Sequence, residues 1–264
     1  MKKKLLALAT IFGAVILVSC ELNEAPQQEL VSEATLSKIS AMGFSTENVQ
    51  RTDGGYLVEG DIILHDHDLT GNHDHKDLRI AEVEQYRTFN LVTGLPRTIV
   101  VTTSGRNITQ RLSDGINAAI ARYNAQNLGI TFVRGGSSGG GNINIRVVNT
   151  NQYIASAGFP SNGNPYNTVS YARNYTNYSL GFVTTVIAHE IGHCIGFRHT
   201  DYMNRAYSCG SGGNEGQATS GVGAIHIPGT PTGPDSGSWM LACLSSTTDR
   251  PFNNNDRVAL DYLY

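Results

Sequence analysis

The residues from His189 to Asp201 read HEIGHCIGFRHTD, and the rest of the chain is best interpreted outward from them. An apolar run with helical spacing leads into this segment, so we predict a helix over residues 180–195. Residues four apart share one face of a helix, so His189 and His193 present their imidazoles on the same side. Two neutral imidazoles at this spacing are suited to hold Zn²⁺.

Three further residues complete a catalytic pattern. Gly196 is suited to end the helix with a sharp turn, which brings His199 round as a third ligand. Three protein ligands leave one coordination position for water, as in catalytic zinc sites and unlike closed structural ones. Glu190 follows the first ligand directly, where its carboxylate reaches the water position and not the metal. The sequence therefore predicts one catalytic Zn²⁺ held by three histidines.

The motif HExxHxxGxxH resembles that of the metzincin zinc endopeptidases, and the letters HEIGH resemble a bacterial branch close to the astacins. The resemblance covers residues 86–264. It implies an α+β catalytic domain with a twisted mixed sheet and two helices, followed by an irregular C-terminal subdomain with a final helix. It also implies hydrolysis of protein or peptide substrates, with Glu190 as the general base. Met240, in Ser238-Trp239-Met240, resembles the methionine of the Met-turn beneath the metal.

The chain departs from the astacin pattern at two places. Astacins carry a tyrosine ligand two residues after the Met-turn methionine, whereas this chain has Ala242 there. Astacins also have glutamate directly after the third histidine, whereas this chain has Thr200 and then Asp201. Asp201 is a candidate for a contact that supports the metal ligands, and a solvated surface carboxylate is the alternative.

The hydrophobic pattern of the body agrees with that fold. β-branched and apolar runs predict strands at 97–103, 130–133, 143–148 and 168–171, and a spacing of three to four predicts a helix over 108–127. A last helix is expected near 255–264. In the resembling family an extended substrate pairs with the edge strand of the sheet, and we expect that edge near residues 168–171.

The N-terminus has the features of an export signal. Three lysines at positions 2–4 precede an apolar run over 5–18 that is shorter than the roughly 20 residues needed to span a bilayer. The segment ends in Leu-Val-Ser-Cys, which resembles a bacterial lipobox with Cys20 as the lipidated residue. Ordinary cleavage with an incidental cysteine is the alternative. We therefore predict a signal peptide over 1–20 and an exported lipoprotein on the outer membrane or cell surface, attached only through its lipid.

Residues 21–85, here called the leader, are predicted to be an acidic tether and prosegment. The leader carries 4 basic and 14 acidic side chains, whereas the body, residues 86–264, carries 12 and 8. This split favours contact between the two parts, although two surfaces that never touch are the alternative. We expect short strands at 56–58 and 62–64. A cut within 65–90 would separate the body from the anchor.

Within the leader, the letters LVEGDI at 57–62 resemble the motif of astacin-like prosegments. That resemblance implies that Asp61 occupies the zinc and keeps the enzyme latent. Carboxylate oxygen is a suitable zinc ligand, and Gly60 permits a close approach of the backbone. The alternative is a plain β-turn in which Glu59 and Asp61 are solvated.

Three cysteines remain once Cys20 is set aside. Cys194 lies in the predicted helix, and we expect it to be a buried thiol. Cys209 and Cys243 lie in loop-rich sequence and are the candidate disulfide, since an exported protein meets an oxidising environment. Sequence alone leaves the connectivity open.

The leading hypothesis is a monomeric zinc endopeptidase made as a latent lipoprotein precursor. The net charge of −3 excludes a dominantly basic nucleic-acid binder. One alternative is a surface binding protein without proteolysis, which has no need of Glu190. Another is a zinc-scavenging lipoprotein that uses the four histidines of residues 65–77, and it predicts more than one zinc per chain.

Overall fold

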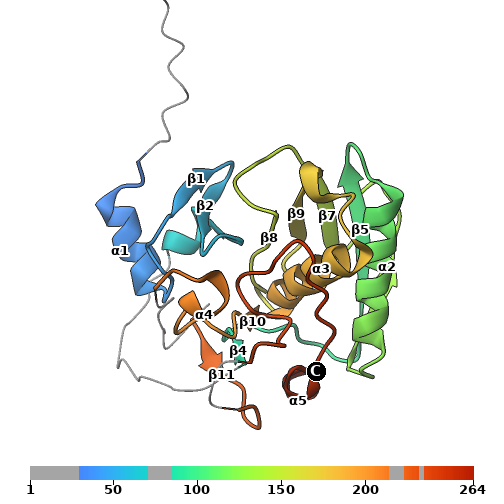
Figure 1. Cartoon of the computed structure of the whole chain (residues 1–264). Coiled ribbons are helices and arrows are strands. Elements are labelled where there is room, and N and C mark those ends of the chain that lie inside the picture. Colours follow the sequence, from blue (N-terminus) through green and yellow to red (C-terminus); the bar gives the residue numbers. More distant parts are fainter. Residues whose placement is uncertain (1–29, 71–84, 214–222, 232–234) are drawn as a thin grey trace, which may run out of the picture.

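The computed structural model describes residues 30–70, 85–213, 223–231 and 235–264 (Figure 1). The predicted signal peptide over 1–20, the predicted lipidation site Cys20 and the histidines at positions 73 and 75 lie outside these ranges. Within them, every helix is too short or too polar to traverse a lipid bilayer. The export and lipidation predictions therefore stay predictions, as do the domain boundaries.

A five-stranded mixed sheet forms the centre of the body, with strand order β6-β5-β7-β9-β8. Four strands run parallel, and the short edge strand β8 pairs antiparallel with β9. Alternate residues of the long strand β5, such as Ile99 and Val101, are fully buried, as expected for a sheet covered by helices. The strands are β5 (Arg97–Gly105), β6 (Ile130–Arg134), β7 (Ile143–Val148), β8 (Ala155–Ser156) and β9 (Thr168–Ala172).

Two helices, α2 (Gln110–Asn124) and α3 (Leu180–Ile195), pack side by side against this sheet (Figure 1). The hydroxyls of Thr109 and Ser179 cap their first turns by accepting backbone N–H bonds. The two helices approach closely at Gly115, where an added Cβ would lie 2.4 Å from the side chain of Val183. α3, the helix with the HEIGH letters, is thereby fixed in the core.

The expected position of the sheet edge was wrong. Residues 168–171 belong to β9, which has β7 on one side and β8 on the other. The edge is β8, a strand of two residues, and this is too short to show the alternation by which a strand is recognised in sequence.

The C-terminal half is largely irregular, as predicted, and ends in helix α5 (Asn254–Leu263). A capping box between Asn253 and Asp256 starts this helix. A small sheet of order β10-β4-β11 joins the start of the body to the residues after α3. The remaining elements are β4 (Tyr86–Arg87), β10 (Phe197–Arg198), α4 (Ala206–Cys209) and β11 (Ile225–His226). The α+β class is as predicted.

The described part of the leader is an ordered unit beside β8 (Figure 1). The strands expected at 56–58 and 62–64 are present, but part of the expected tether is helical from Glu33, with Ser32 as its cap. The leader has its own small core, which includes Ile39 and Leu64 and is joined by Phe159 of the body. Its elements are α1 (Glu33–Ala41), β1 (Gln50–Thr52), β2 (Gly55–Val58), β3 (Ile62–His65) and η1 (Asp68–Thr70).

Candidate active site

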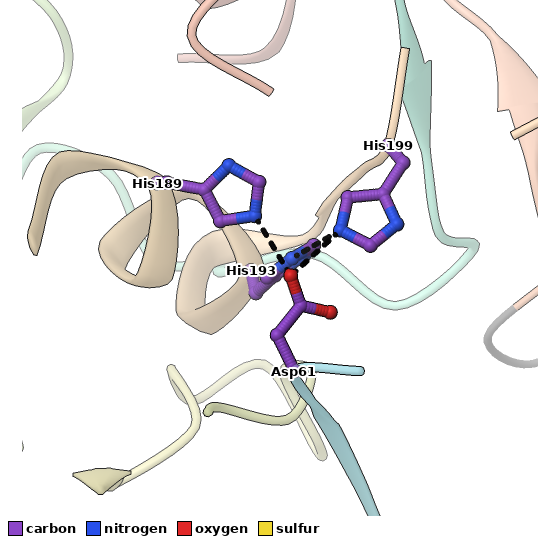
Figure 2. Close-up of side chains that lie close together, drawn as sticks. All are labelled: Asp61, His189, His193 and His199. Atoms are coloured by element: carbon purple, nitrogen blue, oxygen red, sulfur yellow. Dashed lines mark hydrogen bonds and ion pairs between the residues drawn. The ribbon is translucent and has the colours of Figure 1, made fainter. Parts of the chain in front are cut away.

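The three motif histidines converge on one point (Figure 2). His189 and His193 project from the last turns of α3, and the helix ends at Gly196 with a φ of +110°. A Cβ at that position would lie 2.7 Å from Leu91 Cδ2 and 2.9 Å from the carbonyl oxygen of Asn90, so only glycine fits. The sharp turn brings His199 back toward α3, with its Nε2 3.2 Å from Nε2 of His193.

Hydrogen bonds on the far sides of the rings fix which nitrogen faces the centre. Nδ1 of His189 donates to the carbonyl oxygen of Trp239 at 2.9 Å, and Nδ1 of His193 donates to that of Phe197 at 2.8 Å. A carbonyl only accepts, so each Nδ1 carries the proton and each Nε2 keeps a free lone pair. This is the tautomer that a metal-ligating imidazole needs.

Asp61 of the leader supplies a fourth ligand atom. Its Oδ2 lies 3.1 Å from Nε2 of His199 and 3.3 Å from Nε2 of His189 (Figure 2). The four ligand atoms all lie within 4.8 Å of one another. Asp61 follows the turn between β2 and β3, where Glu59 and Gly60 both adopt positive φ. That turn directs the carboxylate between the histidines.

The donor set fits a zinc ion. Lone pairs of two imidazoles and a carboxylate face one another in a buried centre, an arrangement that a cation stabilises. Nε2 of His189 and Oδ1 of Asp61 are buried and make no hydrogen bond. Burial, and then the neighbouring His189 and His199, lower the pKa of His193 well below its usual value, so its ring is neutral and able to bind a metal.

Glu190 lies beside the centre without being part of the ligand cluster. Its side chain is 3% exposed, and Oε2 has no hydrogen-bond partner. Burial, and then the charge of Asp61, raise the pKa of Glu190 well above its usual value. Burial by itself would also raise the pKa of Asp61, but His199 and His189 outweigh it and hold that pKa well below its usual range. The surroundings of these two neighbouring carboxylates therefore shift their pKa values in opposite directions.

The leader is attached to the body at the edge of the sheet. Just beyond β8, the backbone N–H of Ala157 donates to the carbonyl of Asp61 at 2.9 Å, and that of Ile63 donates to the carbonyl of Ala157 at 2.8 Å. The bridge between Ile62 and Ala157 is parallel. The leader therefore pairs with backbone groups at the edge of the sheet, in the way that an extended segment adds to a sheet edge.

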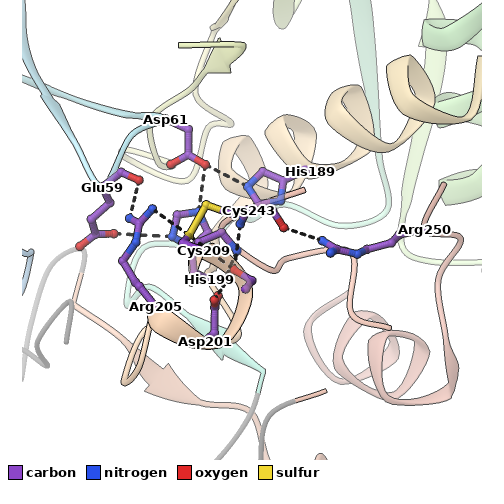
Figure 3. Close-up of a disulfide and its surroundings, with 11 residues drawn as sticks. Glu59, Asp61, His189, His199, Asp201, Arg205, Cys209, Cys243 and Arg250 are labelled. Atoms are coloured by element: carbon purple, nitrogen blue, oxygen red, sulfur yellow. Dashed lines mark hydrogen bonds and ion pairs between the residues drawn. A yellow bond between two sulfur atoms is a disulfide. The ribbon is translucent and has the colours of Figure 1, made fainter. Parts of the chain in front are cut away.

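A buried ion pair also joins leader and body, and sequence reasoning missed it. Nη2 of Arg198 lies 3.2 Å from both carboxylate oxygens of Glu59, and neither side chain is exposed to solvent. Arg205 donates to the carbonyl oxygen of Glu59 (Figure 3). The solvated-turn alternative is therefore wrong for Glu59. The signal in the sequence was the acidic leader together with a body whose basic residues are all arginines. A count of charges does not show which two residues form an ion pair when they lie 139 positions apart.

The remaining predicted residues lie under the metal ligands. The carbonyl oxygen of Met240 accepts a hydrogen bond from the backbone N–H of Thr200 at 2.9 Å. The Met240 sulfur packs so closely against Gly192 of α3 that an added Cβ there would lie 2.6 Å from it. Asp201 is buried, so it is not a surface carboxylate; it accepts from Ala242 N at 2.9 Å and from the hydroxyl of Ser208. These bonds tie the Met240 segment to the third histidine.

The cysteines are arranged around the same loops. A disulfide joins Cys209 and Cys243, and it links α4 to the segment after Met240 (Figure 3). Cys194 is a buried free thiol, and burial raises its pKa well above the usual value.

Of the His-rich stretch the structure describes His65 and His67, and neither belongs to a group of three or more metal-ligating side chains. Nδ1 of His65 contacts the carbonyl of Gly54 at 3.0 Å, and its Nε2 contacts the hydroxyl of Tyr166 at 2.7 Å. Both nitrogens are thus engaged. Among the described residues, the only group suited to a metal is the Asp61 cluster.

Comparison with known proteins agrees with the motif. Residues 58–264 match the Peptidase M57 family, described as dual-action HEIGH metallo-peptidase. No curated protein matches the chain. Two solved structures of myroilysin are similar, one at 18% identity and a TM-score of 0.36 over 46% of this chain and 63% of that one. The other has 16% identity and a TM-score of 0.32 over 49% of this chain and 60% of that one.

This chain thus spans less than two thirds of either myroilysin chain. The family match runs from Val58 to the last residue and so includes the turn that carries Asp61. The family and the cluster of three histidines and one aspartate are consistent with a single catalytic zinc ion. The chain belongs to the HEIGH metallopeptidase family.

Proposed function

We propose that this protein is a zinc-dependent endopeptidase with Glu190 as its general base. The observation that carries the proposal is the convergence of three imidazole Nε2 atoms beside the unpaired Oε2 of a buried carboxylate. A buried carboxylate next to a metal-binding centre supports the assignment of Glu190 as the base.

Zinc, when bound by the three histidines, supplies a Lewis acid that polarises a peptide carbonyl and lowers the pKa of a water. Glu190 takes a proton from the attacking water at its carboxylate and later delivers it to the leaving amine. The raised pKa suits both roles, since a base whose pKa lies nearer neutrality also works as an acid. Departure of Asp61 removes the like charge beside Glu190 and leaves burial as the main cause of that shift.

A cavity of about 230 Å³ beside Glu190 offers room for a substrate side chain. Apolar side chains form much of its wall, including Val186 of α3 and Leu244 after the Met-turn segment. The free backbone groups along β8 and Ala157 would hold the substrate main chain in extended form once the leader has left. Backbone pairing is tolerant of sequence, so protein substrates in general fit this edge.

We also propose that the leader keeps the enzyme latent. Oδ2 of Asp61 lies where the water would have to bind, and the β3 end of the leader covers the substrate edge at Ala157. The ion pair of Glu59 with Arg198 holds the turn in place. Cleavage within residues 65–90 would permit the folded part of the leader to dissociate. By the same proposal the precursor is a lipoprotein anchored through Cys20, and the cut releases the monomeric body.

The test uses a soluble chain that starts at Glu21, with casein as substrate and mass spectrometry of the products. We expect wild type to cleave only after limited trypsin treatment, to lose activity with a chelator and to regain it with zinc. Glu190→Gln should bind zinc but lose about 10²- to 10⁴-fold in rate, the usual contribution of a general base. Zinc binding by both chains with no cleavage by either would contradict the endopeptidase and support the binding-protein alternative.

A further inference from the structure

The two histidines of α3 are oriented by carbonyl groups of different origin. Nδ1 of His193 donates to the carbonyl oxygen of Phe197 at 2.8 Å, only four residues further along the same turn. Nδ1 of His189 donates to that of Trp239 at 2.9 Å, which lies 50 positions away in the chain. The orientation of His189 therefore depends on how the backbone at Trp239 is held.

We propose that Asp256 is a positioning residue for His189 and acts on it through the backbone of Trp239. The inference rests on the proposed zinc endopeptidase, because a correctly oriented imidazole matters most where it binds a metal. It adds to that function a residue on the C-terminal helix, outside the metal cluster.

Both oxygens of Asp256 accept hydrogen bonds in the interior of the protein. Oδ2 accepts from the backbone N–H of Trp239 at 3.4 Å and from that of Asn253 at 2.9 Å. Oδ1 accepts from the side-chain amide of Gln85 at 2.6 Å. Trp239 is thereby held on two sides, since Asp256 accepts from its N–H and His189 donates to its carbonyl.

Gln85 strengthens the hold on the same backbone segment. Its Nε2 also donates to the hydroxyl oxygen of Ser238 at 3.1 Å, and this oxygen accepts from the backbone N–H of Met240 at 3.2 Å. The side chains of Gln85, Ser238 and Asp256 are all completely buried. The residues on either side of Trp239 are thus fixed by two side chains that are 171 positions apart in the sequence.

The donors around Asp256 require a carboxylate and exceed what a helix cap needs. The cap of α5 uses only the bond from Asn253, whereas the bonds from Gln85 and Trp239 lead to the site. Asparagine offers one oxygen and one NH₂ group, so in either orientation it would direct a donor at a donor. Burial raises the pKa of Asp256 to about 6, against the lowering effect of its hydrogen bonds. The fold thus keeps a costly buried acid where it secures the partner of His189.

The first test is NMR on the metal-free soluble chain that starts at Glu21, with ¹⁵N in its histidines. Long-range ¹H–¹⁵N spectra show which ring nitrogen carries the proton and how fast that proton exchanges. In wild type we expect protonated, slowly exchanging Nδ1 atoms in both His189 and His193. In Asp256→Asn the His189 proton should exchange about tenfold or more faster, because its acceptor is no longer fixed. The His193 proton should change by less than about twofold, since its acceptor is local.

The second test is the affinity for Zn²⁺ alone, measured by competition with a chelator. We expect Asp256→Asn to weaken it about tenfold or more, as is usual when a group that orients a ligand is lost. Gln85→Met removes the donor to Oδ1 and should weaken the affinity in the same direction; it decides the question if Asp256→Asn does not fold. Asp261→Asn, at an exposed position of the same helix, is the matched control and should change neither readout.

Unchanged proton exchange at His189, or unchanged zinc affinity, in a folded variant would overturn the positioning role. Equal acceleration at His189 and His193 would also overturn it, because a general loosening of the core affects both rings. Neither readout uses cleavage, so the endopeptidase is decided separately by the comparison of wild type with Glu190→Gln.

Discussion

Oδ2 of Asp61 lies 3.1 Å from Nε2 of His199, although the two residues are 138 positions apart in the chain. The contact is made from opposite sides of an interface, because Asp61 belongs to the leader and His199 to the body. A single carboxylate thus links the state of the leader to the state of the metal site.

Removal of that carboxylate should activate the uncut chain. We expect Asp61→Ala to cleave casein without trypsin treatment, because the water position beside Glu190 is then open. The edge at Ala157 stays covered by the leader, so the rate should remain below that of the trypsin-activated enzyme. Asp53→Ala, at an exposed turn of the same leader, is the matched control and should stay latent. Equal latency of both variants would show that Asp61 is not the inhibitory group.

Moderate acid should not release the leader. The pKa of Asp61 is held below its usual range by His199 and His189, against the opposing effect of burial. A carboxylate with a depressed pKa stabilises the folded state fully at pH values above its ordinary pKa of about 3.9. This stabilisation is lost only as the pH falls through the depressed pKa. We therefore expect a chain held at pH 5 and returned to pH 7 to remain inactive. Activity after that treatment would contradict the prediction that Asp61 stays ionised and bound at the metal site.

The turn at Gly196 should be intolerant of any side chain. Gly196→Ala places a Cβ at a φ of +110° and within 3 Å of Leu91 and of the Asn90 carbonyl, which should lower the free energy of unfolding by about 1–3 kcal/mol. To relieve these contacts the turn has to move, and this moves His199 away from α3. The zinc affinity should therefore fall as well. Gly136→Ala, where a Cβ meets no atom within 4 Å, is the matched control. Denaturant unfolding and zinc titration measure both effects.

Cysteine labelling should distinguish the three cysteines of a chain that starts at Glu21. Cys194 is buried with a raised thiol pKa, and thiols react through the thiolate. We expect iodoacetamide to label no cysteine in the native chain, one after unfolding, and three after unfolding with reduction. Two labelled residues in the native chain would rule out the bond between Cys209 and Cys243.

The metal ligands were predictable because their geometry is local. His189 and His193 share a face of one helix by spacing alone, and Gly196 is the residue that allows the return of His199. The helices and most strands of the body were predictable for the same reason, since their apolar spacing persists over a full element.

Features that depend on packing were not predictable. β8 forms an edge of the central sheet, but a strand of two residues is too short to show an alternating pattern in the sequence. The pair of Glu59 and Arg198 joins a turn and a strand from opposite parts of the chain, and only the docked leader brings them together. Helix α1 was not predicted, because it has only a weakly apolar face. Ile39 is its one fully buried side chain.

The most direct measurement is the mass of the species that cleaves. A soluble precursor is treated with trypsin, and native mass spectrometry is run alongside the appearance of casein cleavage. We expect activity to rise only with a species that holds one zinc and lacks residues 36–64. An active species that still carries those residues would contradict the inhibition of the enzyme by its leader.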